Sequence, residues 1–124
     1  LLRIDPNHAT AHYNLGNALY HQGRVTEAKV QFESALRIRP DYAEADNSLG
    51  VMFAQLGLNA RAKACFEHAL RIAPKYAEAH NNLGVLLLNE GNLLEAEFHF
   101  QRALRIRSAY AEVHSNLGDL FLKQ

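Results

Sequence analysis

An internal repeat with a period of 34 residues constrains this chain more than any other feature. Residues 35–38, 69–72 and 103–106 share the sequence Ala-Leu-Arg-Ile, and all seven glycines fall at two positions of the same register. A repeat of this length is typical of a two-helix unit that buries its apolar face by stacking on its neighbours. The sequence therefore predicts an all-α fold built from repeated helix pairs.

Each repeat is predicted to contain a first and a second helix. Over residues 77–90, apolar and small side chains recur at the spacing of one helical face, and the next glycine ends the helix because glycine tolerates positive φ. The second helix is expected over about residues 94–106. Gly84 and Ala96 are small enough for the two helices to approach closely, and Phe100 is expected to fill the space between them.

Seven positions of the repeat carry a recurring set of apolar, small and proline residues. In the first repeat they are Leu15, Gly16, Leu19, Ala28, Phe32, Ala35 and Pro40. The later copies are Leu49, Gly50, Phe53, Ala62, Phe66, Ala69 and Pro74, then Leu83, Gly84, Leu87, Ala96, Phe100 and Ala103. This set resembles the signature of the tetratricopeptide repeat family over the whole chain. The departures are Ser108 for proline, and His12, Asp46, His80 and His114 where the family has an aromatic residue.

The resemblance implies a right-handed α-solenoid of antiparallel helix pairs, arranged as a single array. Residues 1–8 are expected to end a preceding second helix, and 9–42, 43–76 and 77–110 to form three repeats. Residues 111–124 are expected to form the first helix of a fourth, truncated repeat. Leu117, Leu120 and Phe121 would then lack a covering helix, which favours self-association through uncapped ends.

The overall charge is balanced, with 13 Lys and Arg residues against 13 Asp and Glu residues. No bulk field therefore attracts nucleic acid or an anionic membrane, and neither is an expected partner. No apolar run is long enough to span a bilayer, and the first residues do not resemble a signal peptide. The compartment stays open, with a weak preference for the cytoplasm.

No catalytic, metal or cofactor site is predicted, so the chain is not expected to be an enzyme. The glycines do not form a phosphate-binding motif. His8 and His12 have the spacing of two zinc ligands, but the catalytic Glu is missing and His8 is expected in the turn before the helix. The recurring histidines are expected to pack, half-buried, within their repeats. Cys65 is the only cysteine, which excludes an internal disulfide, and it is interpreted as an incidental thiol.

The face of each first helix opposite its apolar stripe is the predicted binding surface, because the family's first helices line a concave groove. The predicted groove residues are Tyr13, Asn14, Asn17, Tyr20, Asn47, Ser48, Val51, Asn81, Asn82, Val85, Leu88, Ser115 and Asn116. Asparagine both donates and accepts hydrogen bonds, which suits the backbone of an extended peptide. The function favoured is therefore a non-catalytic scaffold that binds a protein or peptide segment.

One column of this surface, formed by Asn14, Ser48, Asn82 and Asn116, resembles the asparagine ladder of O-GlcNAc transferases. That resemblance implies a third role, as the recruitment arm of a larger enzyme such as a glycosyltransferase. Ser48 interrupts the ladder, and the alternative that these are ordinary exposed asparagines stays open. End-to-end assembly into a fibre or large complex is the other alternative function.

The charges predict a neutral or basic partner segment. Chaperone-binding members of the family clamp a terminal carboxylate with Lys and Arg on their first helices. Here the corresponding residues are Tyr13, Asn17, Ser48, Glu78 and Asn82. Glutamates recur at the helix starts and arginines in the last turns of the second helices, where matching of the helix dipole accounts for both.

Overall fold

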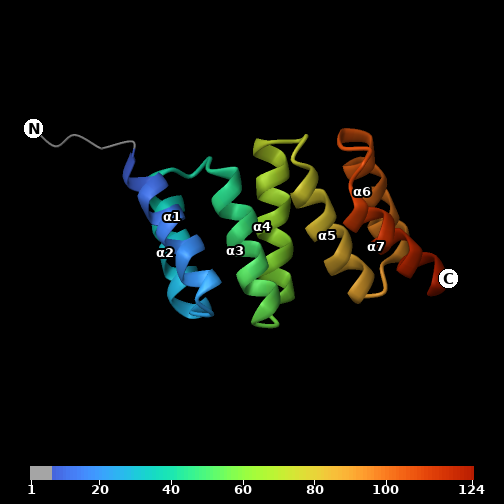
Figure 1. The fold of residues 1–124 in the computed structure, drawn as a ribbon, viewed down its shortest axis with the longest axis horizontal. Coiled ribbons are helices and arrows are strands. Elements are labelled where there is room, and N and C mark those ends of the chain that lie inside the picture. The colour runs from blue at the N-terminus through green and yellow to red at the C-terminus, as the bar shows by residue number, and fades with distance from the viewer. Residues whose placement is uncertain (1–6) are drawn as a thin grey trace, which may run out of the picture. The chain divides into compact units, whose positions relative to one another are not determined.

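The structure, a computed structural model, describes residues 7–124. Over this range the chain forms seven α-helices and no strand (Figure 1). The helices are α1 (Asn7–His21), α2 (Val25–Ile38), α3 (Ala43–Gln55), α4 (Asn59–Ile72), α5 (Ala77–Asn89), α6 (Leu93–Ile106) and α7 (Ala111–Leu122). None of them combines the length and apolar character that crossing a bilayer requires. The described chain forms two compact units, which divide between Cys65 and Phe66.

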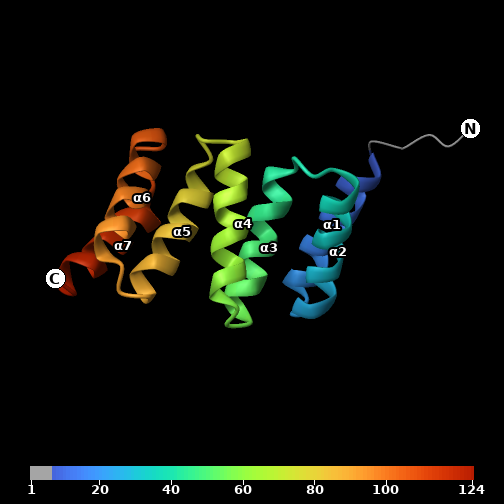
Figure 2. The ribbon, with the colours of Figure 1, turned by 180° about the vertical axis from the view of Figure 1, so that it is seen from behind.

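First helices alternate with second helices, as the repeat predicts. In the N-terminal unit α1 packs against α2, and α3 also packs against α2. In the C-terminal unit α5 packs against α6, and α7 packs mainly against α6. Both views show α1 beside α2 and α5 beside α6, each pair running in opposite directions (Figure 2). The predicted helix pairs are therefore confirmed within each unit.

Close contact between a glycine and a phenylalanine holds each of these two pairs together. A Cβ atom placed on Gly84 would lie 2.6 Å from Cε1 of Phe100, and one on Gly16 would lie 2.7 Å from Cε1 of Phe32. Both phenylalanines are almost completely buried. The rings occupy the space that a side chain at the glycine would need, which confirms the role predicted for Gly84 and Phe100.

Three glycines end first helices in the left-handed conformation. Gly23, Gly57 and Gly91 have φ values of 80°, 76° and 84°. Residues with a Cβ atom rarely adopt this conformation, because Cβ then crowds the carbonyl oxygen. The predicted helix ends are confirmed.

The start of α1 corrects the placement predicted for His8. This residue was expected in the turn before the first helix, but it lies inside α1, which begins at Asn7. His8 is exposed, whereas Tyr42 at the equivalent position of the next repeat is buried and anchors the chain as the N-cap residue of α3. Residues 1–6, expected to end a preceding helix, lie outside the described residues.

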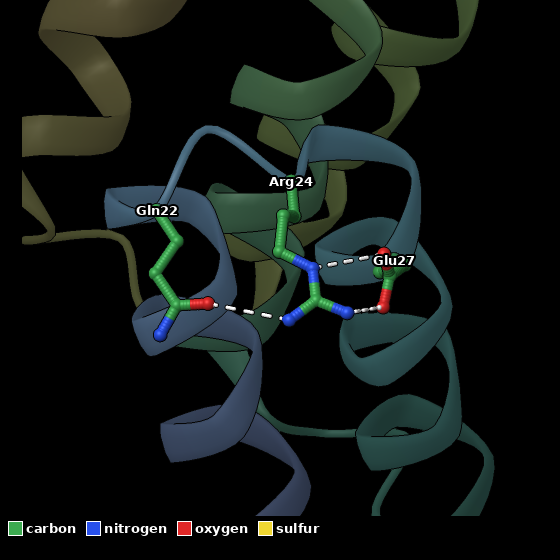
Figure 3. Close-up of polar contacts among 3 residues, drawn as sticks. All are labelled: Gln22, Arg24 and Glu27. Atoms are coloured by element: carbon green, nitrogen blue, oxygen red, sulfur yellow. Dashed lines mark hydrogen bonds and ion pairs between the residues drawn. The ribbon is translucent and has the colours of Figure 1, made fainter.

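A polar cluster specific to the first repeat lies at the turn between α1 and α2. Arg24 donates from Nε to Oε1 of Glu27 at 2.9 Å and from Nη1 to Oε1 of Gln22 at 3.4 Å (Figure 3). The side chains of Arg24 and Glu27 are about half exposed, so this ion pair contributes little to stability. The equivalents of Arg24 are Leu58 and Asn92, so the turn does not depend on it.

The last helix corrects the expectation of an uncovered apolar end. Leu120 has no exposed surface, while Phe121 is 53% exposed and Leu122 is 87% exposed. Leu120 faces the interior of the C-terminal unit, because α7 packs against α6 and α5 on that side. Leu117 is partly exposed, and Phe121 and Leu122 present most of the apolar surface, so only part of the reason to expect association there is removed.

Candidate peptide-binding surface

In the N-terminal unit, the predicted groove residues of α1 have different surroundings. Asn14 is exposed and Asn17 is half-buried. The hydroxyl of Tyr20 accepts a hydrogen bond from Nε2 of Gln55 at 2.8 Å, which ties the end of α1 to the end of α3. Tyr13 is less accessible, because its ring lies 5.9 Å from that of Phe32 and against the core of this unit.

The partly exposed face of α3 continues with less polar side chains. Ser48 and Val51 are both half-buried, and they lie at the positions of Asn14 and Asn17 in the repeat. The amide column is thus interrupted by a hydroxyl, and Val51 offers an apolar contact beside it. Together these residues provide alternating polar and apolar side chains of moderate size.

In the C-terminal unit, the accessible predicted residues lie on α5 and α7. Asn82 and Val85 are half-buried, Ser115 is exposed and Asn116 is half-buried. Nδ2 of Asn116 donates a hydrogen bond to Oδ1 of Asn81 at 2.8 Å. This bond fixes the orientation of the Asn116 amide.

The exposure predicted for Asn47, Asn81 and Leu88 is wrong. Asn47 is 9% exposed, Asn81 is 1% exposed and Leu88 is 7% exposed. A helix that packs against more than one neighbour buries a wider stripe than a single amphipathic face, so part of the opposite face is buried as well. These three residues cannot form the accessible floor of a groove.

Asn81 has a structural role that its position in the sequence did not indicate. Besides accepting from Asn116, its side chain hydrogen-bonds the hydroxyl of Tyr110, the N-cap residue of α7. Burial raises the pKa of Tyr110, so this hydroxyl stays protonated. One buried amide thus links α5 to the start and to the middle of α7, as a satisfied buried polar group should.

The first helices carry no positive side chain within the described residues. Neither Lys nor Arg occurs in α1, α3, α5 or α7, and Lys123 is the C-cap residue of α7. Glu44, Glu78 and Glu112 lie exposed in the first turns of α3, α5 and α7, as predicted from the helix dipole. The charge of these helices is therefore negative or neutral.

In the helix pairs α1–α2 and α5–α6, a polar contact joins the first helix to the second at positions 19 residues apart. In α1–α2 it joins Nδ1 of His12 to Oε1 of Gln31 at 2.7 Å, and in α5–α6 it joins Nδ1 of His80 to Nδ1 of His99 at 3.1 Å. Nε2 of His80 also contacts the carbonyl oxygen of Pro74 at 3.0 Å. Desolvation lowers the pKa of His80, so this buried imidazole is held neutral. His12 and His80 thus pack between the helices of their repeats, whereas His114, which was also expected to be half-buried, is exposed.

In the second repeat, Cys65 lies at the position that Gln31 and His99 occupy in the first and third repeats. Burial raises the pKa of its thiol to about 12, and the carboxylates of Asp46 and Glu33 contribute to the rise. The thiol is therefore protonated at neutral pH and is a poor nucleophile. Among the described residues, no group of three or more His, Cys, Asp or Glu side chains is placed to hold a metal ion.

A column of tyrosines at the N-cap positions was not predicted from the sequence. Tyr42 and Tyr110 are buried, and the guanidinium groups of Arg39 and Arg107 lie 4.4 Å and 4.3 Å from the centres of their rings. These two arginines therefore cover tyrosine faces as well as lying near helix ends. The signal was available, because tyrosine recurs at 42, 76 and 110.

Family models of the tetratricopeptide repeat match residues 41–109 and 1–30, and a model of the TPR repeat matches residues 16–57. No curated protein matches the chain.

Three solved structures have the same fold. The first TPR of Spaghetti (RPAP3) bound to the HSP90 peptide SRMEEVD has a TM-score of 0.92 and 19% identity, covering 96% of this chain and 94% of that one. The first TPR domain of human RPAP3 has a TM-score of 0.91 and 19% identity, covering 95% and 93%. The Arabidopsis OM64 TPR domain has a TM-score of 0.92 and 18% identity, covering 96% and 98%. At these identities the similarity concerns the all-α helical-repeat fold.

Proposed function

Because this chain belongs to the tetratricopeptide repeat family, we propose that it is a non-catalytic scaffold that binds a protein or peptide segment along its first helices. The observation that carries this proposal is that, within each unit, the first helices present partly exposed amide and small apolar side chains. Asn14, Ser48 and Val51 belong to the N-terminal unit, and Asn82 and Val85 to the C-terminal unit. Such a surface offers hydrogen bonds and shallow apolar contacts without a reactive group.

The amides suit a guest with an extended backbone, whose N–H and C=O groups both need partners. Asn116 illustrates the geometry. Its Nδ2 is occupied by Asn81, which leaves its carbonyl oxygen directed elsewhere as an acceptor for a backbone N–H. Orientation fixed in advance reduces the entropy lost on binding.

The charge of the first helices supports a neutral or basic guest. They contain no Lys or Arg over the described residues, and each of α3, α5 and α7 has an exposed glutamate in its first turn. The peptide held by the Spaghetti domain contains three acidic residues. A peptide of that composition would meet no complementary charge on the first helices of this chain.

Peptide display against the immobilised chain tests this proposal. The selected peptides that bind the first helices should be neutral or basic, and the double variant Asn82→Ala with Val85→Asp should weaken their binding by roughly tenfold or more, as expected for loss of an interface centre. Asn59→Ala, which removes an exposed amide from a second helix, is the matched control and should leave the affinity unchanged. Equal binding by the double variant and the wild type would contradict the proposal.

Two finer roles are also proposed. Association between copies is supported by the exposed side chains of Phe121 and Leu122, and sedimentation of Phe121→Ser against the wild type tests it. A recruitment arm of a larger enzyme is supported by the amides of Asn14, Asn82 and Asn116 on the first helices, although Ser48 interrupts that column. The recruitment role fails if the full-length protein modifies none of the peptides that bind this surface.

A further inference from the structure

The outward side of α6 carries an apolar pair that its role in the helix pair does not explain. Leu94 is 82% exposed and Phe98 is 52% exposed. They lie four residues apart, so they are neighbours on one helical face. Phe100, which packs against α5, faces the opposite way and is fully buried. Two large exposed apolar side chains in contact range form a candidate interaction surface.

The other second helices lack this pair. The positions of Leu94 and Phe98 are filled by Thr26 and Val30 in α2, and by Ala60 and Ala64 in α4. The repeat therefore does not require large apolar residues here, and the pair is a property of α6 alone.

A basic depression adjoins the apolar pair. It has a volume of about 160 Å³ and is lined by Phe98, Gln101, Arg102 and Arg105. At the position of Gln101, α2 and α4 carry Glu33 and Glu67. The acidic residue of the other repeats is thus absent from α6, and two arginines remain beside the exposed ring.

The arginine nearest the apolar pair is held in place. The guanidinium carbon of Arg102 lies 5.2 Å from the centre of the Phe98 ring, and the ring of His99 meets Phe98 edge-on at 5.2 Å. A guanidinium stacked on an aromatic face keeps its N–H edge available for a carboxylate. Within residues 7–124, neither Arg102 nor Arg105 forms an ion pair with a carboxylate.

We propose that this surface, the α6 outer face formed by Leu94, Phe98, Arg102 and Arg105, binds an acidic segment of a partner protein. The segment presents a large apolar side chain to Leu94 and Phe98, and carboxylates to the two arginines. Phe98 and Arg105 are seven residues apart, so the two features of the partner are separated by about 10 Å. Aromatic and arginine side chains dominate the energy of many protein interfaces, which suits this composition.

A peptide fits this surface better than an anionic membrane does. Glu95 is exposed and Glu97 is half-buried on the same helix, and Oε2 of Glu97 accepts a hydrogen bond from Nε2 of Gln101 at 3.3 Å. A dense layer of phosphates would be repelled by these carboxylates, whereas a peptide can place its own carboxylates only at the arginines. The proposal concerns the second helix α6 and does not depend on the first-helix surface.

Fluorescence anisotropy with a labelled amphipathic peptide tests the proposal. The peptide carries leucine and tryptophan at one end of a helical face and glutamates about 10 Å further along the same face, and a matched peptide has glutamine in place of each glutamate. The wild-type chain should bind the acidic peptide, more weakly at high salt, and should bind the glutamine peptide at least about tenfold less tightly. Absent binding of the acidic peptide, or equal binding of both, would overturn the proposal.

Variants that copy residues of the other repeats locate the binding. Leu94→Ala with Phe98→Ala gives α6 the residues of α4, so the fold should persist, and affinity should fall by about tenfold or more. Arg102→Gln with Arg105→Gln should lower affinity by several-fold and remove the salt dependence. Arg71→Gln, at the position of Arg105 in α4, is the control and should have no effect. An unchanged affinity in either double variant would overturn the proposal, with circular dichroism confirming that each variant is folded.

Two further experiments test whether a membrane or a second copy of the chain occupies the α6 outer face instead of a peptide, and whether the peptide binds α5. Stronger binding to phosphatidylserine vesicles than to the acidic peptide, or a dimer that dissociates on Phe98→Ala, would replace the proposed partner and overturn the proposal. The variant Asn82→Ala with Val85→Asp should bind the acidic peptide as the wild type does, which supports a separate site on α6. Loss of binding in that variant would instead place the peptide on α5 and overturn the proposal.

Discussion

The helix pairs α1–α2 and α5–α6 occupy equivalent positions two repeats apart, and they differ in a consistent way. Their inner contacts are almost the same, with Gly16 against Phe32 in one pair and Gly84 against Phe100 in the other. The inner contact is constrained because any larger residue at the glycine would overlap the ring. Outside that contact, the two pairs have diverged.

The divergence concerns the polar contact and the outer face. His12 bonds Gln31 in α1–α2, whereas the equivalent contact in α5–α6 joins two histidines. Val30 of α2 is replaced in α6 by Phe98, which stacks with Arg102. The glycine and phenylalanine that pack between the two helices are therefore kept in both pairs. Residues beside that contact differ, and they can give one repeat an interaction that the others lack.

Removing the buried phenylalanine of either pair should have the largest effect on the free energy of unfolding, and the loss should be similar in the two pairs. Phe32→Ala and Phe100→Ala each leave a cavity in the core, and each should lower the free energy of unfolding by about 3 to 5 kcal/mol. Urea denaturation followed by circular dichroism measures the loss. Phe98→Ala, on the exposed side of α6, should change it by less than about 0.5 kcal/mol. A strongly unequal loss of stability in the two core variants would show that the contacts of Phe32 and Phe100 are not equivalent.

Adding a methyl group at the shared glycines should have an intermediate effect. Gly16→Ala and Gly84→Ala force the added Cβ against Phe32 and Phe100, and should cost about 1 to 3 kcal/mol. At Gly118 nothing lies within 4 Å of an added Cβ, so Gly118→Ala should stabilise α7 by up to about 1 kcal/mol through helix propensity. Thermal melts should show a lower melting temperature than the wild type for Gly16→Ala and Gly84→Ala, and a higher one for Gly118→Ala. A melting temperature of Gly84→Ala above that of the wild type would contradict this expectation.

The difference in the polar contacts should appear as a smaller, pH-dependent effect. Desolvation lowers the pKa of His80 below its ordinary 6.5, with Arg102 also lowering it and the carbonyl of Pro74 opposing the shift. His80 faces His99 on α6 as well. Its contribution to stability is therefore fully present above about pH 6.5 and is lost as the pH falls below that value.

Two variants check this expectation by urea denaturation across the pH range. His80→Gln should reduce the loss of stability on acidification. His99→Gln gives α5–α6 the histidine–glutamine contact of α1–α2, and should keep part of the loss because His80 remains desolvated. An unchanged pH profile in His80→Gln would show that this histidine does not carry the effect.

Much of the fold could be predicted, because the features that define it recur. The positions of Gly84 and Phe100, the glycines that end first helices and the glutamates in first turns all follow from local rules repeated every 34 residues. The start of α1 could not be predicted in the same way. The spacing of apolar residues on one helical face does not fix the residue at which a helix begins, so the inclusion of His8 in α1 could not be read from it.

The candidate site was predicted only in part. Asn81 and Asn82 are adjacent and chemically identical, yet the first is buried and bonded to Asn116 while the second is half-exposed. The prediction from the sequence gave each first helix one exposed face, and it placed both asparagines on that face. Burial depends on which helices pack on that face, and this is not encoded in the spacing of residues along one helix.

By itself, the sequence determined the repeat, the helix pairs and the contacts inside each pair, because periodic packing leaves few alternatives at those positions. Only the tertiary structure decided that Leu120 is covered, that Tyr42 and Tyr110 lie beneath arginines, and that Phe98 is exposed beside Arg102. The physical reason is that burial and side-chain stacking arise between helices, whereas sequence periodicity reports the faces of each helix alone.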